Sequence, residues 1–266
     1  MSQIDKRESA FLKDLYLHEL WTSRFVDLLD KSLKTDEAPE NIAYINAGTG
    51  NHVFALRERF GKESEIFPFC EDEETLRIAV GKAEAMLSDV TFRCGDCDGD
   101  DFELVILDAS MSAPEELEPK IRSAVEACRP GGSVAMLCVT AGSFGEIYSL
   151  LWENYFSAGD LEGGQKVEKL INEIFTCTAL EETAKSAGLH KVVTKISNET
   201  FELGEDEDIS SSVLLKKFLL PRWLGTNDES VVNETLDSLV RLMKEEDADL
   251  AFRFSVKATL LTGTKK

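Results

Sequence analysis

The chain has 266 residues, 43% of them hydrophobic and 30% charged, and its formal net charge is −21. This acidic balance argues against nucleic acid or an anionic membrane as partner, and no cluster of lysines and arginines offsets it. Small molecules or protein partners fit this charge better. No apolar run approaches the length of a membrane span and the N-terminus shows no signal-peptide core, so we expect a cytoplasmic protein.

The N-terminal segment has the pattern of an amphipathic helix, or of two. Between residues 9 and 33, apolar side chains recur at helical spacing. A polar connector rich in charged residues follows. We therefore expect residues 1–40 to form a helical cap that precedes the rest of the fold.

Short apolar runs then alternate with helical patterns. The expected strands are 42–46, 65–70, 90–94, 102–108 and 133–140, and the expected helices are 51–60, one opened by residues 71–74, and 115–128. Pro68 in the second strand suggests a bulge or a missing ladder hydrogen bond, and residues 129–132 (R-P-G-G) suggest a sharp turn. Strands that alternate with helices in this way predict an α/β fold with a doubly wound, mostly parallel sheet.

After residue 140 the alternation of strands and helices is less regular. We expect helices at 144–156, 166–173, 178–187, 211–221 and 228–246, and strands at 189–197 and 252–263. The chain is then a single domain over 1–266, with a helical insert at 198–250 between the last two strands. The acidic run 205–208 lies in this insert and is expected to be a solvated loop.

Two features contain residue types that bind cofactors or metals. Gly48 and Gly50 form a G-x-G turn between the first strand and its helix, where backbone N–H groups and the helix dipole favour an anionic group. Cys94 and Cys97 form a C-x-x-C match, but no second pair of ligands accompanies it. We therefore expect a nucleotide-type site at the glycine turn, reduced thiols and no metal.

The strand ends that follow strengthen the glycine turn. Glu71 and Asp72 follow the second strand, where an acidic side chain commonly holds the ribose hydroxyls of a nucleotide. Asp96 follows the third strand and Asp108 ends the fourth. Because the carboxyl ends of parallel strands meet at one edge of a sheet, these side chains are expected to share a crevice.

With these motifs in place, the chain resembles the class I S-adenosylmethionine-dependent methyltransferases, in particular the branch that acts on small molecules. The resemblance spans nearly the whole chain and runs through I-A-Y-I-N-A-G-T-G-N-H, I-F-P-F-C-E-D-E-E-T, V-T-F-R-C-G-D-C, F-E-L-V-I-L-D and C-R-P-G-G-S-V-A-M-L. The last two strands are similar to the antiparallel hairpin that ends the sheet of this family. The resemblance implies a Rossmann-like sheet, S-adenosyl-L-methionine or S-adenosyl-L-homocysteine as cofactor, and a small-molecule substrate.

The resemblance also implies roles for individual residues. Asn46, Gly48, Thr49 and Gly50 correspond to the loop at the methionine end of the cofactor.

The other cofactor contacts fall on the next strand ends. Cys70, Glu71 and Asp72 correspond to the ribose-binding end of the second strand, and Asp96 and Cys97 to the adenine-binding segment. Asp108 corresponds to the crevice where the methyl group is transferred.

Three positions depart from the family pattern. Tyr44 stands where an acidic residue is usual, Asn46 where a glycine is usual, and Cys70 where the ribose carboxylate belongs. Asparagine tolerates positive φ well, whereas Tyr44 is bulky and could fill space beside the methionine moiety. The alternative is therefore a catalytically inactive relative that serves as a binding or partner subunit, with a protein partner.

Two residues are candidates for the chemistry. Methyl transfer to a nucleophile mainly needs alignment, and a general base is needed only when the nucleophile is poorly acidic. Asp108 is the stronger candidate because it ends a strand in the crevice, although it also suits a cap of the next helix. His18 on the N-terminal helix is the other candidate, and a packed or surface histidine is its alternative interpretation.

Overall fold

The N-terminal segment is helical almost throughout. The computed structural model describes residues 3–33, 38–97, 99, 101–202, 211–246 and 252–266, and in it α1 (Gln3–Leu12), a π-helix (Lys13–Thr22) and α2 (Ser23–Asp30) follow one another directly. The strongest burial lies near the end of this segment, where Trp21, Phe25 and Leu29 are fully buried. The helix expected within 9–33 is thus confirmed as far as Asp30.

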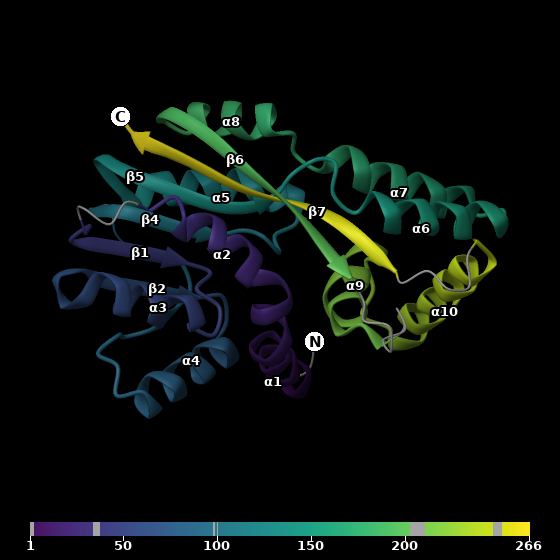
Figure 1. Cartoon of the computed structure of the whole chain (residues 1–266), viewed down its shortest axis with the longest axis horizontal. Helices are drawn as coiled ribbons and strands as arrows, with labels where there is room; N and C mark the ends of the chain where they lie inside the picture. Colours follow the sequence, from purple (N-terminus) through teal and green to yellow (C-terminus); the bar gives the residue numbers. More distant parts are fainter. Residues whose placement is uncertain (1–2, 34–37, 98, 100, 203–210, 247–251) are drawn as a thin grey trace. The chain divides into compact units, whose positions relative to one another are not determined.

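The strands of the described chain form one mixed sheet (Figure 1) in the order β3-β2-β1-β4-β5-β7-β6. They are β1 (Asn41–Ile45), β2 (Glu65–Cys70), β3 (Arg93–Cys94), β4 (Phe102–Asp108), β5 (Cys128–Val139), β6 (Leu189–Glu202) and β7 (Arg253–Lys265). β1 to β5 are parallel where they pair, and β7 runs antiparallel to β5. This arrangement confirms the predicted Rossmann-like sheet with its antiparallel C-terminal strand.

Helices connect the parallel strands in the predicted order. They are α3 (Asn51–Phe60), α4 (Glu73–Ala85), α5 (Pro114–Ala127) and α8 (Cys177–Ser186), with a 3₁₀ turn at Gly61–Glu63. Local chemistry sets their starts: Asp72 caps α4 by accepting a hydrogen bond from the N–H of Thr75 at 2.8 Å, and Pro114 opens α5.

The centre of the sheet is apolar. Val105, Ile106 and Leu107 of β4 are 0% exposed, as are Ile42 and Ala43 of β1. A continuous apolar run of this kind is typical of a parallel strand that is covered on both faces. Burial of this core fixes the carboxyl ends of the strands, from which the candidate site is built.

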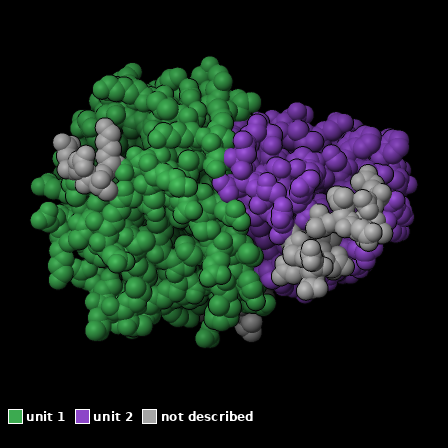
Figure 2. Space-filling view, in the orientation of Figure 1, with its two compact units in different colours: residues 1–139, 176–197, 258–266 green, residues 140–175, 198–257 purple. Residues whose placement is uncertain are grey.

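The chain divides into two compact units, each shown in its own colour in Figure 2. One unit comprises residues 1–139, 176–197 and 258–266 and contains the strand ends β1 to β4. The other comprises 140–175 and 198–257, so it combines the expected insert with an earlier segment. A single domain over 1–266 remains an expectation.

The second unit is mainly helical. Its helices are α6 (Gly145–Ser157), α7 (Leu161–Glu173), a π-helix (Leu214–Leu219), α9 (Leu220–Leu224) and α10 (Glu229–Glu246). Phe144, Tyr148 and Trp223 pack together, with the ring of Trp223 5.0 Å from Phe144 and 5.1 Å from Tyr148. These aromatic residues therefore form part of the core of this unit.

Three local expectations agree with the structure only in part. The third strand, expected over 90–94, is confined to Arg93–Cys94. Of the two expectations for Pro68, the bulge is wrong, because Pro68 pairs with Tyr44 in regular register. The missing ladder bond agrees with the structure, because β3 pairs with β2 only beyond Pro68, at Phe69 and Cys70. The turn at 129–132 lies within β5 as an irregularity, because Cys128 pairs with Phe102 and Ser133 already pairs with Leu104.

Two remaining expectations concern the surface. In the portions of the chain that the structure covers, none of the helices has the length and apolar character to span a membrane. The acidic run 205–208 lies outside the described residues.

Candidate functional site

The glycine loop is built as its sequence suggests. It leaves β1 at Ile45 and enters α3 at Asn51, and Asn46, Gly48 and Gly50 have φ values of 56°, 56° and 86°. Asn46 adopts a conformation that glycine usually supplies, and its Nδ2 donates a hydrogen bond of 3.0 Å to the carbonyl of Asp108. The substitution at position 46 therefore retains the loop and ties it to the end of β4.

The predicted ligand residues gather at one edge of the sheet. β1, β2, β3 and β4 are neighbouring parallel strands, so the segments that follow them lie along the same edge. The Sγ of Cys70 donates to the carbonyl of Gly48 at 3.3 Å, and the N–H of Gly95 donates to the carbonyl of Cys70 at 3.2 Å. Asp96 is exposed and Cys97 half-buried beyond this point.

Cys70 does not replace a ribose carboxylate chemically. Burial raises the pKa of its thiol to about 12, with the neighbouring carboxylates of Glu71 and Asp72 adding to the effect. The Asp72 carboxylate already accepts a hydrogen bond from Thr75 as the N-cap of α4, whereas Glu71 does not cap this helix. Glu71 is therefore the stronger candidate for the ribose hydroxyls.

The N-terminal helical segment contributes side chains to the site that the sequence did not single out. The Nζ of Lys13 lies 2.9 Å from Oε1 of Glu71 and 3.6 Å from Oδ2 of Asp72. Burial lowers the pKa of Lys13, but the two carboxylates outweigh burial and hold its pKa above the ordinary value. Lys13 is therefore charged, and it pairs with the residues expected to hold the ribose.

A second contact joins the same segment to the glycine loop. The Oγ1 of Thr49 donates a hydrogen bond of 2.6 Å to Oδ1 of Asp14, and Lys82 of α4 forms an ion pair with that same oxygen. The Nζ of Lys82 also lies 2.6 Å from Oδ1 of Asn51. A carboxylate thus lies at the loop where α3 begins, with a lysine beside it.

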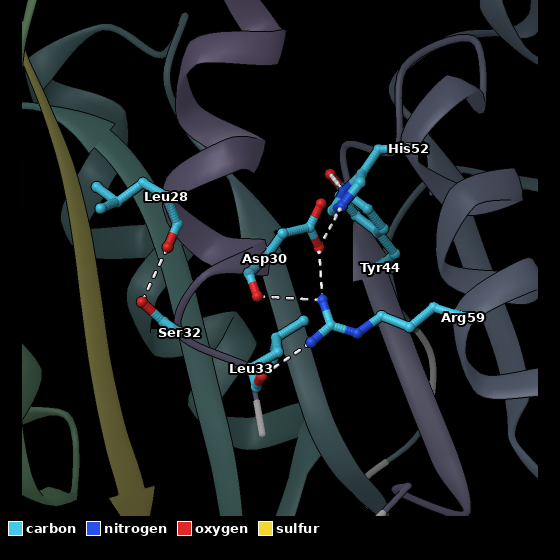
Figure 3. A network of polar contacts seen from close by, with 7 residues as sticks. All are labelled: Leu28, Asp30, Ser32, Leu33, Tyr44, His52 and Arg59. Atoms are coloured by element: carbon cyan, nitrogen blue, oxygen red, sulfur yellow. Dashed lines mark hydrogen bonds and ion pairs between the residues drawn. The ribbon is translucent and has the colours of Figure 1, made fainter. Parts of the chain in front are cut away.

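Tyr44 belongs to a partly buried polar network (Figure 3), which extends from β1 to the end of α2. Its hydroxyl lies 2.9 Å from Nδ1 of His52, and Nε2 of His52 lies 3.3 Å from Oδ1 of Asp30. Arg59 completes the network by donating to Oδ1 of Asp30 at 3.1 Å and to the carbonyl of Leu33 at 2.8 Å. The tyrosine hydroxyl is therefore paired within the protein and ties the sheet to the N-terminal helices.

Acid is expected to weaken this network. Burial raises the pKa of Asp30, but its bonds and charge interactions with His52 and Arg59 outweigh burial and lower it. A lowered folded-state pKa means that this contribution to stability is complete above the unfolded-state value near 3.9 and is lost as the pH falls through the folded-state value. The free energy of unfolding, measured by urea titration at pH 3 to 6, should fall at the acid end.

Asp30→Asn should flatten this acid dependence, whereas Asp27→Asn, at an exposed position of the same helix, should retain it. Identical pH profiles for wild type and Asp30→Asn would show that Asp30 does not carry the effect.

The two candidate residues for chemistry have different surroundings. Asp108 Oδ1 accepts a hydrogen bond of 2.9 Å from the N–H of Ser110, and burial raises the pKa of its carboxyl group despite this bond. Ser110 Oγ in turn accepts a hydrogen bond of 3.1 Å from Nε1 of Trp21. Asp108 therefore stabilises its own turn, and a catalytic role for it stays a prediction.

His18 lies half-buried on the π-helix. Burial lowers the pKa of its imidazole, and the positive charge of Lys82 and the neighbouring His52 lower it further. A lowered pKa favours the neutral form, which can accept a proton at physiological pH. A role as general base is chemically consistent with this environment and also stays a prediction.

The residues that the sequence missed are Lys13, Asp14 and Lys82. Their partners are 58 residues away for Lys13 and Glu71, and 68 residues away for Asp14 and Lys82. Charged residues on amphipathic helices usually face solvent, so their spacing carries no signal for such contacts.

Comparisons with known proteins identify the class of fold. The structure is similar to that of a putative methyltransferase from Bacillus halodurans, with a TM-score of 0.56, 14% identity and coverage of 91% of this chain and 99% of that one. It is equally similar to the YcgJ protein of Bacillus subtilis, with a TM-score of 0.56, 12% identity and coverage of 92% and 99%.

A third solved structure has its ligand named. It is phosphoethanolamine N-methyltransferase 2 of Haemonchus contortus in complex with S-adenosyl-L-methionine, with a TM-score of 0.52, 14% identity and coverage of 92% of this chain and 52% of that one.

These similarities confirm that the chain has the fold of the class I S-adenosylmethionine-dependent methyltransferases. No protein-family model matches the sequence, and a search of curated proteins finds no significant match. At identities of 12 to 14% the shared fold does not carry over a substrate or an activity.

Proposed function

We propose that this protein binds S-adenosylmethionine at the carboxyl edge of β1 to β4 and transfers its methyl group to a small molecule. The observation that carries this proposal is the glycine loop. Gly48 and Gly50 take positive φ values directly before the ten-residue helix α3, and the Thr49 hydroxyl and Lys82 ammonium already hold a carboxylate there. A cofactor with a carboxylate and a ribose fits a loop of this chemistry that lies beside Glu71.

Within this proposal the chain has mainly a binding and positioning role. Glu71 holds the ribose hydroxyls, the loop holds the amino-acid end, and Asp96 and the backbone of Cys97 contact the adenine. S-adenosylmethionine, when bound, supplies a methyl group on a good leaving group, so the protein must align the acceptor and exclude water. Neutral His18 or Asp108 accepts a proton if the acceptor atom carries one.

Calorimetric titration with S-adenosylmethionine and S-adenosylhomocysteine tests the cofactor. We expect dissociation constants in the micromolar range, and Glu71→Gln should weaken both ligands by about tenfold, because a charged acceptor of ribose hydrogen bonds is lost. Glu118→Gln, an exposed change on α5, is the matched control and should leave both constants unchanged. Absence of binding at millimolar ligand, both in wild type and in variants that lack the Asp14 carboxylate at the loop, would rule out the proposed function.

A second candidate function is that of a binding or partner subunit without catalysis. One observation favours it: several side chains of the site already have partners within the chain. Tyr44 is bonded to His52, Asp108 to Ser110, and Glu71 to Lys13. Absence of cofactor binding in the titration above would favour this candidate.

A further inference from the structure

We propose that Lys13 and Asp14 occupy the cofactor-binding groups in place of the cofactor, and that Lys82 exchanges the Asp14 carboxylate for the carboxylate of the incoming ligand. The inference rests on the proposed function and extends it to self-occlusion of the site. It identifies Lys82 as a cofactor-binding residue.

Asp14 lies where the carboxylate of the ligand is expected to bind. Its Oδ1 accepts a hydrogen bond of 2.6 Å from Oγ1 of Thr49 and forms an ion pair with Lys82. Thr49 lies in the glycine loop directly before Gly50, which is the N-cap residue of α3. Helix N-termini favour negative groups, and a carboxylate bound by a hydroxyl and an ammonium has the contacts that a free amino acid carboxylate needs. Asp14 therefore stands in for the carboxylate of the methionine moiety.

Lys13 occupies the residues that are expected to bind the ribose. It pairs with Glu71 at 2.9 Å and lies 3.6 Å from Asp72, so the acidic residues expected to accept the ribose hydroxyls already have an ammonium partner. Two consecutive residues of one helix thus cover two separate parts of the same expected ligand. A ligand that binds there must displace both contacts.

The segment that carries these residues is held mainly by polar contacts. None of the side chains from Phe11 to Leu20 is buried, and Phe11 is 56% and Leu15 47% exposed. A surface groove of about 460 Å³, lined in part by Phe11 and Arg77, lies against α1 and α4. Segments with few buried apolar contacts open at low free-energy cost.

The next turns of the same segment are firmly anchored. Trp21 is 0% exposed and donates to Ser110 Oγ, and Phe25 packs against it with ring centroids 5.2 Å apart. Release of Lys13 and Asp14 can therefore occur by local movement of residues 11–20, while Trp21 and α2 stay in place. This movement would leave the Lys82 ammonium beside Thr49 and Asn51, where it can bind the carboxylate of the ligand.

Opposite effects of two substitutions test the exchange. Asp14→Asn removes the competing charge and should lower the dissociation constant of S-adenosylhomocysteine roughly five- to tenfold, whereas Lys82→Gln should raise it by about tenfold. 5′-Methylthioadenosine has no amino acid carboxylate, so Lys82→Gln should change its affinity less than about twofold. Glu8→Gln, the same loss of charge at an exposed position of α1, is the control and should behave as wild type.

Hydrogen exchange supplies a second readout, which measures the opening of residues 11–20 directly. Amides of residues 11–20 should exchange faster in Asp14→Asn than in wild type or Glu8→Gln, and faster in wild type once S-adenosylhomocysteine is bound.

The outcomes separate the two proposals. If wild type binds S-adenosylhomocysteine and Asp14→Asn binds it equally, the exchange is wrong and the proposed function stands. Unchanged affinity in Lys82→Gln overturns the role of Lys82 in the same way. If wild type, Asp14→Asn and the double variant Lys13→Met/Asp14→Asn all fail to bind at millimolar ligand, the proposed function is wrong and the exchange fails with it.

Discussion

Replacement of Gly50 by alanine is expected to lower the free energy of unfolding by about 2–4 kcal/mol and to abolish cofactor binding. Gly50 has φ 86° and ψ 0°, a left-handed conformation that costs other residues about 1–2 kcal/mol. A Cβ at this position would lie 2.5 Å from Cζ of Phe92. Phe92 is buried and packs against Phe54 with ring centroids 5.5 Å apart, so it cannot move aside without further cost.

Gly48→Ala is the matched control. Gly48 also has a positive φ of 56°, but a Cβ there would meet no atom within 4 Å. Its substitution should therefore cost only the backbone strain, about 1–2 kcal/mol. Urea unfolding followed by tryptophan fluorescence measures both variants, and equal losses would show that contact with Phe92 does not matter.

The strands that enter the core were the most predictable part of the fold. β2 and β4 begin and end where the runs 65–70 and 102–108 do, because a strand covered on both faces is apolar over most of its length. β3 was less predictable. Val90 and Phe92 are buried as their pattern suggested, yet only Arg93 and Cys94 pair with β2, since periodicity reports burial and not backbone pairing.

The candidate site was predictable in position but not in its present contacts. The glycine loop and the end of β2 lie where their sequence signals indicated, since these signals are local. The contacts of Lys13 with Glu71 and of Asp14 with Lys82 depend on how a distant helix meets the sheet. No local sequence pattern indicates how these two distant segments pack, so these contacts could be found only in the structure.

Replacement of Tyr44 by aspartate, the acidic type usual at this position in the family that the chain resembles, is expected to lower the free energy of unfolding by about 3–5 kcal/mol. Tyr44 is 1% exposed, so the loss of its ring would leave a cavity in β1. The new carboxylate would also be buried near Asp108 and Asp30. Burial raises the pKa of Tyr44, and the negative charges of these two residues raise it further. Urea unfolding provides the measurement.

Tyr44→Phe separates the hydroxyl from the ring. It keeps the packing but leaves Nδ1 of His52 without its 2.9 Å partner, so we expect a smaller loss of about 1–3 kcal/mol. If Tyr44→Asp instead keeps wild-type stability and binds S-adenosylmethionine more tightly than wild type, tyrosine at this position is a defect in an otherwise ordinary cofactor loop. We expect the free energy of unfolding to be highest in wild type, lower in Tyr44→Phe and lowest in Tyr44→Asp. This order would mean that the chain has replaced a ligand contact with a structural one. The loop would then rely on Thr49, Lys82 and Glu71 to hold its cofactor.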